Sequence, residues 1–259
     1  MQRHTFQNNG LTLSYLDSAV EKPILIALHA HWMEGSTFIP LASAIDSDWR
    51  VIVLDQRGHG FSDHASTYTR ADYLSDLNAL LTHLKIIEPI VLLGNSLGGI
   101  NAYHFAATHP NLVRALIIED IGVELDADAT DVSFSLAWSG VFKNREELEE
   151  RIGPRFMPYF KGSLRQTEMG WQLPFSPEEM LISNENVIGD HWQEWLASHC
   201  PALIVRGKDS RVTTQEHLEE MAKRRPNTQL ETLEAGHVVH FDNPKEFMRA
   251  VKDFLRPLK

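Results

Sequence analysis

Ser96 stands at the centre of the segment 94–98, Gly-Asn-Ser-Leu-Gly, and its hydroxyl is a candidate nucleophile. A serine hydroxyl is a weak nucleophile at neutral pH and needs a neighbouring imidazole to take its proton. A carboxylate must in turn hold that imidazole in the correct tautomer. Gly-x-Ser-x-Gly between a strand and a helix is the sequence form of a sharp turn that exposes the serine above a sheet. The segment therefore predicts acyl-transfer chemistry centred on Ser96.

Asp209 and His237 are the candidates for the carboxylate and the imidazole. Asp209 comes just after the apolar run 203–205, and His237 follows another short predicted strand. Sites of α/β sheets lie at the carboxyl ends of parallel strands. Each residue alone could be an ordinary loop residue. The order serine, acid, histidine, with both partners at strand ends, favours the catalytic interpretation.

Other residues could compete for these roles. Asp120, at the end of the run 116–118, is a second candidate acid, and His240 is a second candidate base that we expect to pack or to line the pocket. His29 and His31 have the spacing of metal ligands, with Glu34 close by. The aspartate and the further histidine that metallo-hydrolases add to such a pair are missing, so we expect no metal site.

The elements that must position these residues alternate along the chain. Two short alternating runs joined by Asn8-Asn9-Gly10 predict a β-hairpin. Continuous apolar runs, which are typical of strands buried on both faces, follow at 24–28, 51–54, 90–93 and 115–118. Residues 69–72 resemble a capping box that opens a helix, and another helix should follow Ser96. This alternation predicts a parallel sheet with right-handed crossovers.

The alternation stops at about residue 122 and resumes at about residue 198. The stretch 123–197 contains acidic helical pieces and many aromatic residues, which predicts an inserted helical cap. Residues 1–122 and 198–259 then form the core. We expect Trp32, beside the loop after the third strand, to face the pocket, and Trp138 and Phe142 to bind substrate from the cap.

Four segments together resemble the α/β-hydrolase superfamily, in the branch that carries a helical cap. They are 28–32, 55–63, the turn around Ser96, and Gly236-His237 near Asn243-Pro244. The resemblance implies a mostly parallel eight-stranded sheet with helices on both faces, and no cofactor. It makes Ser96, Asp209 and His237 the catalytic triad.

The same resemblance implies an oxyanion hole built from the backbone N–H groups of Leu97 and His31. Ala30 departs from the family pattern, which usually has a glycine after the histidine of this loop. An alanine does not adopt a positive φ cheaply. Ala30 could therefore disturb the donor at His31.

The nucleophile type narrows the reaction. Cap-bearing epoxide hydrolases and haloalkane dehalogenases resemble this layout but carry an aspartate where this chain has Ser96. Serine favours hydrolysis of a small, apolar ester, with thioesters and lactones as close variants. Carbon–carbon hydrolases of ring-cleavage products are an alternative, although residues 31–34 lack their glycine-rich stretch. A ligand-sensing receptor that retains the triad is the alternative outside enzymes.

Composition limits the partners. The 259 residues include 35 acidic and 24 basic side chains, so the surface field should repel polyphosphates and anionic lipid heads. We therefore expect neither nucleic acid nor a membrane as a partner, and a monomer or homodimer. Cys200 is the single cysteine, which excludes an internal disulfide framework, and no apolar run marks a secretory signal. A cytoplasmic location is the expectation.

Overall fold

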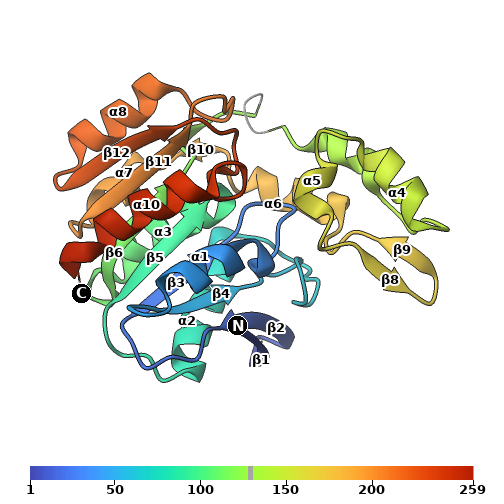
Figure 1. Cartoon of the computed structure of the whole chain (residues 1–259), viewed down its shortest axis with the longest axis horizontal. Helices are drawn as coiled ribbons and strands as arrows, with labels where there is room; N and C mark the ends of the chain where they lie inside the picture. Colours follow the sequence, from blue (N-terminus) through green and yellow to red (C-terminus); the bar gives the residue numbers. More distant parts are fainter. Residues whose placement is uncertain (128–130, 259) are drawn as a thin grey trace.

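The computed structural model describes residues 1–127 and 131–258. Eight strands form one sheet in the order β1-β2-β4-β3-β5-β6-β11-β12, parallel from β4 onward (Figure 1). The strands are β1 (Gln2–Asn8), β2 (Leu11–Asp17), β3 (Ile24–Leu28), β4 (Arg50–Leu54), β5 (Ile90–Asn95), β6 (Val113–Glu119), β11 (Ala202–Gly207) and β12 (Thr228–Leu233). The predicted mostly parallel, eight-stranded α/β sheet is confirmed.

The predicted N-terminal hairpin is also confirmed. Strands β1 and β2 pair antiparallel with Asn8 opposite Leu11. Asn9 and Gly10 between them have φ values of 47° and 81°. Positive φ at both central residues is the geometry of a type I′ turn, whose twist matches that of the strands.

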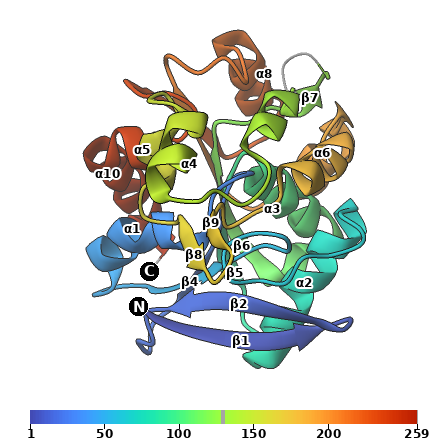
Figure 2. The ribbon, with the colours of Figure 1, turned by 90° about the vertical axis from the view of Figure 1, so that its right-hand side faces the viewer.

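Alternate residues of the parallel strands are buried on opposite faces of the sheet, as their continuous apolar runs predict. On β3, Ile26 packs into one core and Leu25 and Ala27 into the other. Helices α2 (Arg70–His83), α3 (Leu97–Thr108), α7 (Trp192–Ala197) and α8 (Gln215–Arg224) supply the first core. Helices α1 (Ile39–Ile45), α9 (Val239–Asp242) and α10 (Pro244–Leu255) supply the second. Figure 2 shows α1 and α10 on one side of the molecule and α2 and α3 on the other.

The predicted cap segment, residues 123–197, lies between β6 and β11. Its elements are β7 (Glu124–Leu125), η3 (Ser133–Trp138), α4 (Arg145–Ile152), α5 (Met157–Phe160), β8 (Arg165–Thr167), β9 (Gly170–Gln172), α6 (Pro177–Glu185) and β10 (Gly189–Asp190), followed by α7. In Figure 1, α4, α5, β8 and β9 are set off to one side of the sheet. The segment is thus helical with one antiparallel hairpin, β8–β9, which the sequence pattern did not predict.

The two ends of the cap segment pack differently from its middle. Val123 and Trp195 belong to the main core, whereas Trp138, Phe160 and Met180 form a separate apolar cluster. The short strands β7 and β10 pair where the chain leaves and re-enters the core. Among residues 1–127 and 131–258, no helix combines the length and apolar character needed to cross a bilayer.

Candidate active site

Ser96 occupies a strained turn between β5 and α3. Its φ and ψ are 52° and −116°, a conformation that residues other than glycine rarely adopt. The turn is tight enough to exclude side chains at its flanking glycines. A Cβ on Gly94 would lie 2.2 Å from the backbone of Gly98, and one on Gly98 would lie 2.1 Å from the carbonyl oxygen of Leu28. The Gly-x-Ser-x-Gly spacing is therefore a steric requirement of this turn, which leaves Ser96 partly exposed.

Asn95 ties this turn to His237. The Asn95 Nδ2 donates to the backbone carbonyls of Glu119 and His237, each over 3.2 Å. Ser96 N–H also donates to the carbonyl of Glu119, over 3.0 Å. The turn, the end of β6 and the loop after β12 thus meet at one edge of the sheet.

The carboxylate that holds His237 is Asp120 and not the predicted Asp209. The Nδ1 of His237 lies 2.7 Å from Oδ2 of Asp120, whose side chain is completely buried, while that of His237 is 28% exposed. A carboxylate only accepts here, so Nδ1 carries the proton and Nε2 keeps its lone pair. Two further hydrogen bonds hold the Asp120 carboxylate in place. The Gly207 N–H donates to Oδ1 over 2.9 Å, and the Ser210 hydroxyl donates to Oδ2.

Asp209 is exposed, beside Lys208 on the turn after β11. Strands β6 and β11 are parallel neighbours, so Asp120 and Asp209 both follow strand ends at the same sheet edge. Asp120 has a φ of 51°. With this left-handed backbone, the Asp120 carboxylate contacts Gly207 at the end of β11, Ser210 in the loop after it, and His237. The loop after β11 therefore turns Ser210 toward Asp120 and leaves Asp209 in solvent, so the predicted contact between Asp209 and His237 is absent.

His240, the second candidate base, is bonded to Glu119 and not to Asp120. Its side chain is buried, and Nδ1 lies 2.8 Å from a carboxylate oxygen of Glu119. Its ring stacks on Phe38, with centroids 4.1 Å apart. His240 is thus packed into the core against the end of β6, the strand that precedes Asp120.

The two predicted oxyanion donors lie at a helix start and in a tight turn. Leu97 is the first residue of α3, where backbone N–H groups are free and the helix dipole is positive. Within the described part of the chain, neither the Leu97 nor the His31 backbone N–H has a hydrogen-bond partner. Both groups are thus available to an external acceptor.

In the oxyanion loop the residue with a positive φ is Trp32 and not Ala30, where backbone strain was expected. Met33 N–H donates to the carbonyl of Ala30 over 3.3 Å, and Trp32 has a φ of 67°. A positive φ at the third residue is the geometry of a type II turn. Ala30 keeps a negative φ, so its departure from glycine costs no backbone strain.

The imidazoles of this loop are engaged within the protein. His29 Nδ1 donates to the Ala30 carbonyl over 2.8 Å, while its Nε2 accepts from Gln56 N–H over 3.0 Å. His31 Nε2 contacts the Ser183 hydroxyl of α6 at 2.8 Å. Glu34 forms an ion pair with Arg165 of β8. The three candidate metal ligands of this loop therefore have three different sets of partners, and those of His31 and Glu34 lie in the cap segment.

Of the predicted substrate contacts, Trp32 joins the cap to the core. Its ring meets Phe134, Trp138 and Phe156 edge-on, at centroid distances of 5.3, 5.8 and 6.2 Å. Trp138 is buried within this cluster. The backbone of Phe142 pairs with that of Trp171 on β9. Trp138 and Phe142 thus take part in the packing of the cap segment. That Trp32, Trp138 and Phe142 contact substrate stays a prediction.

Buried histidines around the site predict a loss of stability in acid. Burial lowers the pKa of His29 from 6.5 to about 4, and burial likewise lowers the pKa of His31 and His59 well below 6.5. Below about pH 6.5 these histidines become protonated in the unfolded chain but stay neutral in the folded chain. The free energy of unfolding therefore falls as the pH falls toward 4. Each imidazole contributes up to about 1.4 kcal/mol per pH unit. Urea unfolding between about pH 7.5 and pH 4.5 measures the slope, and a stability that stays constant or rises toward pH 5 would contradict it.

Comparison with known proteins agrees with the fold. The sequence profile described as "alpha/beta hydrolase fold" matches residues 23–244. A 2-(acetamidomethylene)succinate hydrolase from Mesorhizobium japonicum is 27% identical over 245 residues, 90% of this chain and 88% of that protein. An sn-1-specific diacylglycerol lipase from Mus musculus is 27% identical over 270 residues, 95% of this chain and 85% of that protein.

Solved structures show the same likeness over nearly the whole chain. The crystal structure of an E-2-(acetamidomethylene)succinate hydrolase superposes with a TM-score of 0.86 at 23% identity, covering 98% of this chain and 100% of the other. An α/β hydrolase from Novosphingobium aromaticivorans gives a TM-score of 0.82 at 26% identity, covering 98% of each chain. These similar proteins are hydrolases, and the names of the succinate hydrolase and the diacylglycerol lipase specify different substrates.

Proposed function

The chain belongs to the α/β-hydrolase fold family, and on that premise we propose that it is a serine hydrolase that cleaves a small carboxylic ester through an acyl-enzyme intermediate. One observation carries the proposal: the strained Ser96 turn is bonded through Asn95 to the loop of His237, whose Nδ1 is held by the buried Asp120. Ser96, His237 and Asp120 are the proposed triad, with Asp120 replacing Asp209.

In the first half of the proposed reaction, the Ser96 hydroxyl attacks the acyl carbon and His237 Nε2 takes its proton. The carbonyl oxygen becomes an oxyanion that accepts from the backbone N–H groups of Leu97 and His31. The intermediate collapses, the C–O bond to the alcohol breaks, and the alcohol leaves with the proton from His237. Asp120 stabilises the imidazolium and keeps its orientation throughout.

In the second half, water attacks the acyl-enzyme and gives a proton to His237 Nε2. The second tetrahedral intermediate collapses, the acyl–Ser96 bond breaks, and Ser96 recovers its proton. The carboxylic acid leaves. No step needs a group other than water and the side chains already named.

Arg70 bears on the polarity of the substrate. Its guanidinium donates to Asn101 and, over 3.0 Å, to the backbone carbonyl of Asn186. Within residues 1–127 and 131–258 it forms no ion pair with a carboxylate, and its charge adds to the effect of burial in lowering the pKa of His31. A buried positive charge that acts on His31 and lacks a carboxylate partner would favour an ester that carries a carboxylate over the apolar ester expected from the sequence.

A substrate panel tests the proposed function. It contains short-chain aryl esters, with and without a terminal carboxylate, and a matched thioester, lactone and ring-cleavage dienone. We expect multiple turnovers on an ester, and faster turnover of the carboxylate-bearing ester. Turnover of the dienone alone would instead support the carbon–carbon hydrolase, and a single turnover followed by tight retention of product would support a receptor.

A further inference from the structure

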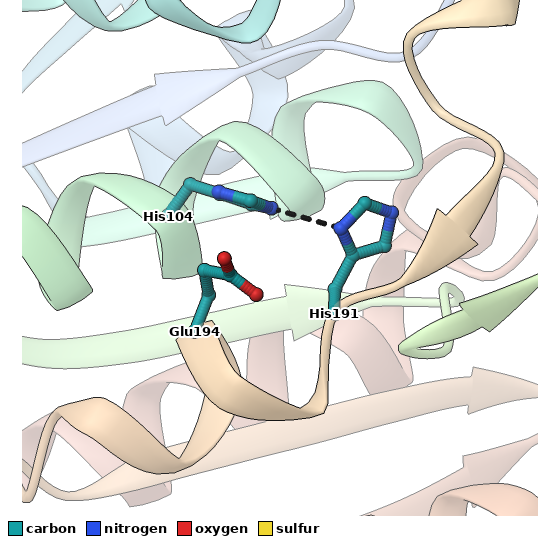
Figure 3. A group of neighbouring side chains, drawn as sticks. All are labelled: His104, His191 and Glu194. Atoms are coloured by element: carbon teal, nitrogen blue, oxygen red, sulfur yellow. Dashed lines mark hydrogen bonds between the residues drawn. The ribbon is translucent and has the colours of Figure 1, made fainter.

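A second cluster of chemistry-bearing side chains lies where the cap segment returns to the core. It consists of His104 on α3, His191 just before α7, and Glu194 in the first turn of α7, and one ligand atom from each lies within 4.8 Å of the others. Figure 3 shows these side chains converging from two elements. We propose that His104, His191 and Glu194 bind a Zn²⁺ ion that fastens the returning cap segment to α3.

The hydrogen bonds of His191 prepare one ligand. Its Nε2 lies 2.8 Å from the backbone carbonyl of Val187, so Nε2 carries the proton and Nδ1 keeps a bare lone pair. A metal-bound histidine usually donates its other ring N–H to a carbonyl or carboxylate in this way. The Nδ1 of His191 points at Nε2 of His104, 3.1 Å away.

The separation of these two nitrogens suits a shared ion. In a tetrahedral zinc site with bonds of about 2.0–2.1 Å, neighbouring ligand atoms are about 3.3 Å apart. The observed 3.1 Å therefore needs only a small adjustment. Glu194 is partly exposed, and a change of rotamer can bring its carboxylate closer. Two imidazole nitrogens, one carboxylate oxygen and a water complete a donor set typical of zinc.

Binding changes the tautomer of His104. In the metal-free protein the His104 Nε2–H donates to His191. Binding requires the neutral His104 ring to move its proton from Nε2 to Nδ1 through solvent, which releases no proton.

The charges around the cluster set its strength. Glu194 supplies one negative charge, and its carboxylate lies within 4.8 Å of the ligand atoms of His104 and His191. The positive charge of Arg70 acts on His104 and opposes a cation there. We therefore expect a weaker site than a closed structural site with four protein ligands.

The position of the cluster indicates a structural ion. His104 is eight residues after Ser96 on the same helix, about 12 Å along its axis. The His191 N–H donates to the carbonyl of Val123 over 2.7 Å, so the cluster sits at the point where the chain both leaves and re-enters the core. An ion there would join α3 to the segment β10–α7 without touching the reacting atoms.

Zinc titration of the full chain, stripped of metal with a chelator, tests the proposal. Calorimetry should show one Zn²⁺ per chain, and Co²⁺ should give the visible absorption of a four-coordinate site. His104→Ala and Glu194→Gln should each weaken binding by about 10- to 100-fold or more. Zn²⁺ should also raise the unfolding temperature of the wild-type chain but not that of Glu194→Gln.

Two controls separate this result from background binding and from the proposed hydrolase. His199→Ala removes an exposed histidine of the same region and should leave the affinity unchanged. Ser96→Ala should bind zinc as the wild type does, whether or not the hydrolase proposal holds. Glu194→Gln keeps the shape of the side chain, so its zinc affinity tests the proposal if His104→Ala does not fold. The proposal is overturned by the absence of saturable zinc binding, or by an affinity that neither cluster variant changes.

Discussion

Replacing Ser96 by alanine should reduce kcat for ester hydrolysis by about 10⁶-fold while the protein remains folded. Alanine lacks the attacking oxygen, so no acyl-enzyme can form. The substitution keeps the Cβ and therefore the backbone strain that serine already bears at its φ of 52°. Initial rates on the best ester of the panel, for the wild type and Ser96→Ala, measure the effect.

Ser96→Ala needs a check that its loss is chemical. Its circular dichroism and urea midpoint should match those of the wild type, since no other side chain is removed. A folded Ser96→Ala variant that retains more than about one per cent of wild-type kcat would refute Ser96 as the nucleophile.

Asp120→Asn should lower kcat by about 10⁴-fold. The carboxylate accepts the Nδ1 proton of His237 and leaves Nε2 free to take the proton of Ser96. An amide N–H facing His237 would force the ring to accept at Nδ1 and to carry its proton at Nε2, where it cannot act as the base. The loss should appear in kcat at saturating substrate.

The matched control is Asp209→Asn, which makes the same change on an exposed side chain after the neighbouring strand. Its kcat should stay within about twofold of the wild type, since surface changes away from the site have small effects. A severe loss in Asp209→Asn together with normal turnover in Asp120→Asn would restore the acid chosen from the sequence.

Patterns in the sequence predict the strands and the turn that carries Ser96 well. Continuous apolar runs locate β3 to β6 because a buried parallel strand has no polar face. Asn8-Asn9-Gly10 locates the hairpin because its turn needs two positive φ values. The glycines around Ser96 are needed because backbone lies close to them, that of Gly98 at Gly94 and that of Leu28 on the neighbouring strand at Gly98.

Contacts between residues far apart in the sequence are predicted less well. Asp120 and Asp209 follow neighbouring strands, and only the tertiary position of Ser210 shows which carboxylate faces His237. The strain expected at Ala30 falls at Trp32, because the register of a tight turn depends on the hydrogen bond that closes it. His104 and His191 are 87 residues apart, so no spacing could have revealed their contact.

The most direct test of the proposed triad is mass spectrometry after reaction with an aryl phosphonate ester, which traps an activated serine as a stable adduct. We predict one phosphonyl group per wild-type chain, located on the peptide that contains Ser96, and no adduct on Ser96→Ala. A wild-type chain that stays unmodified, or one modified at a different serine, would contradict the account.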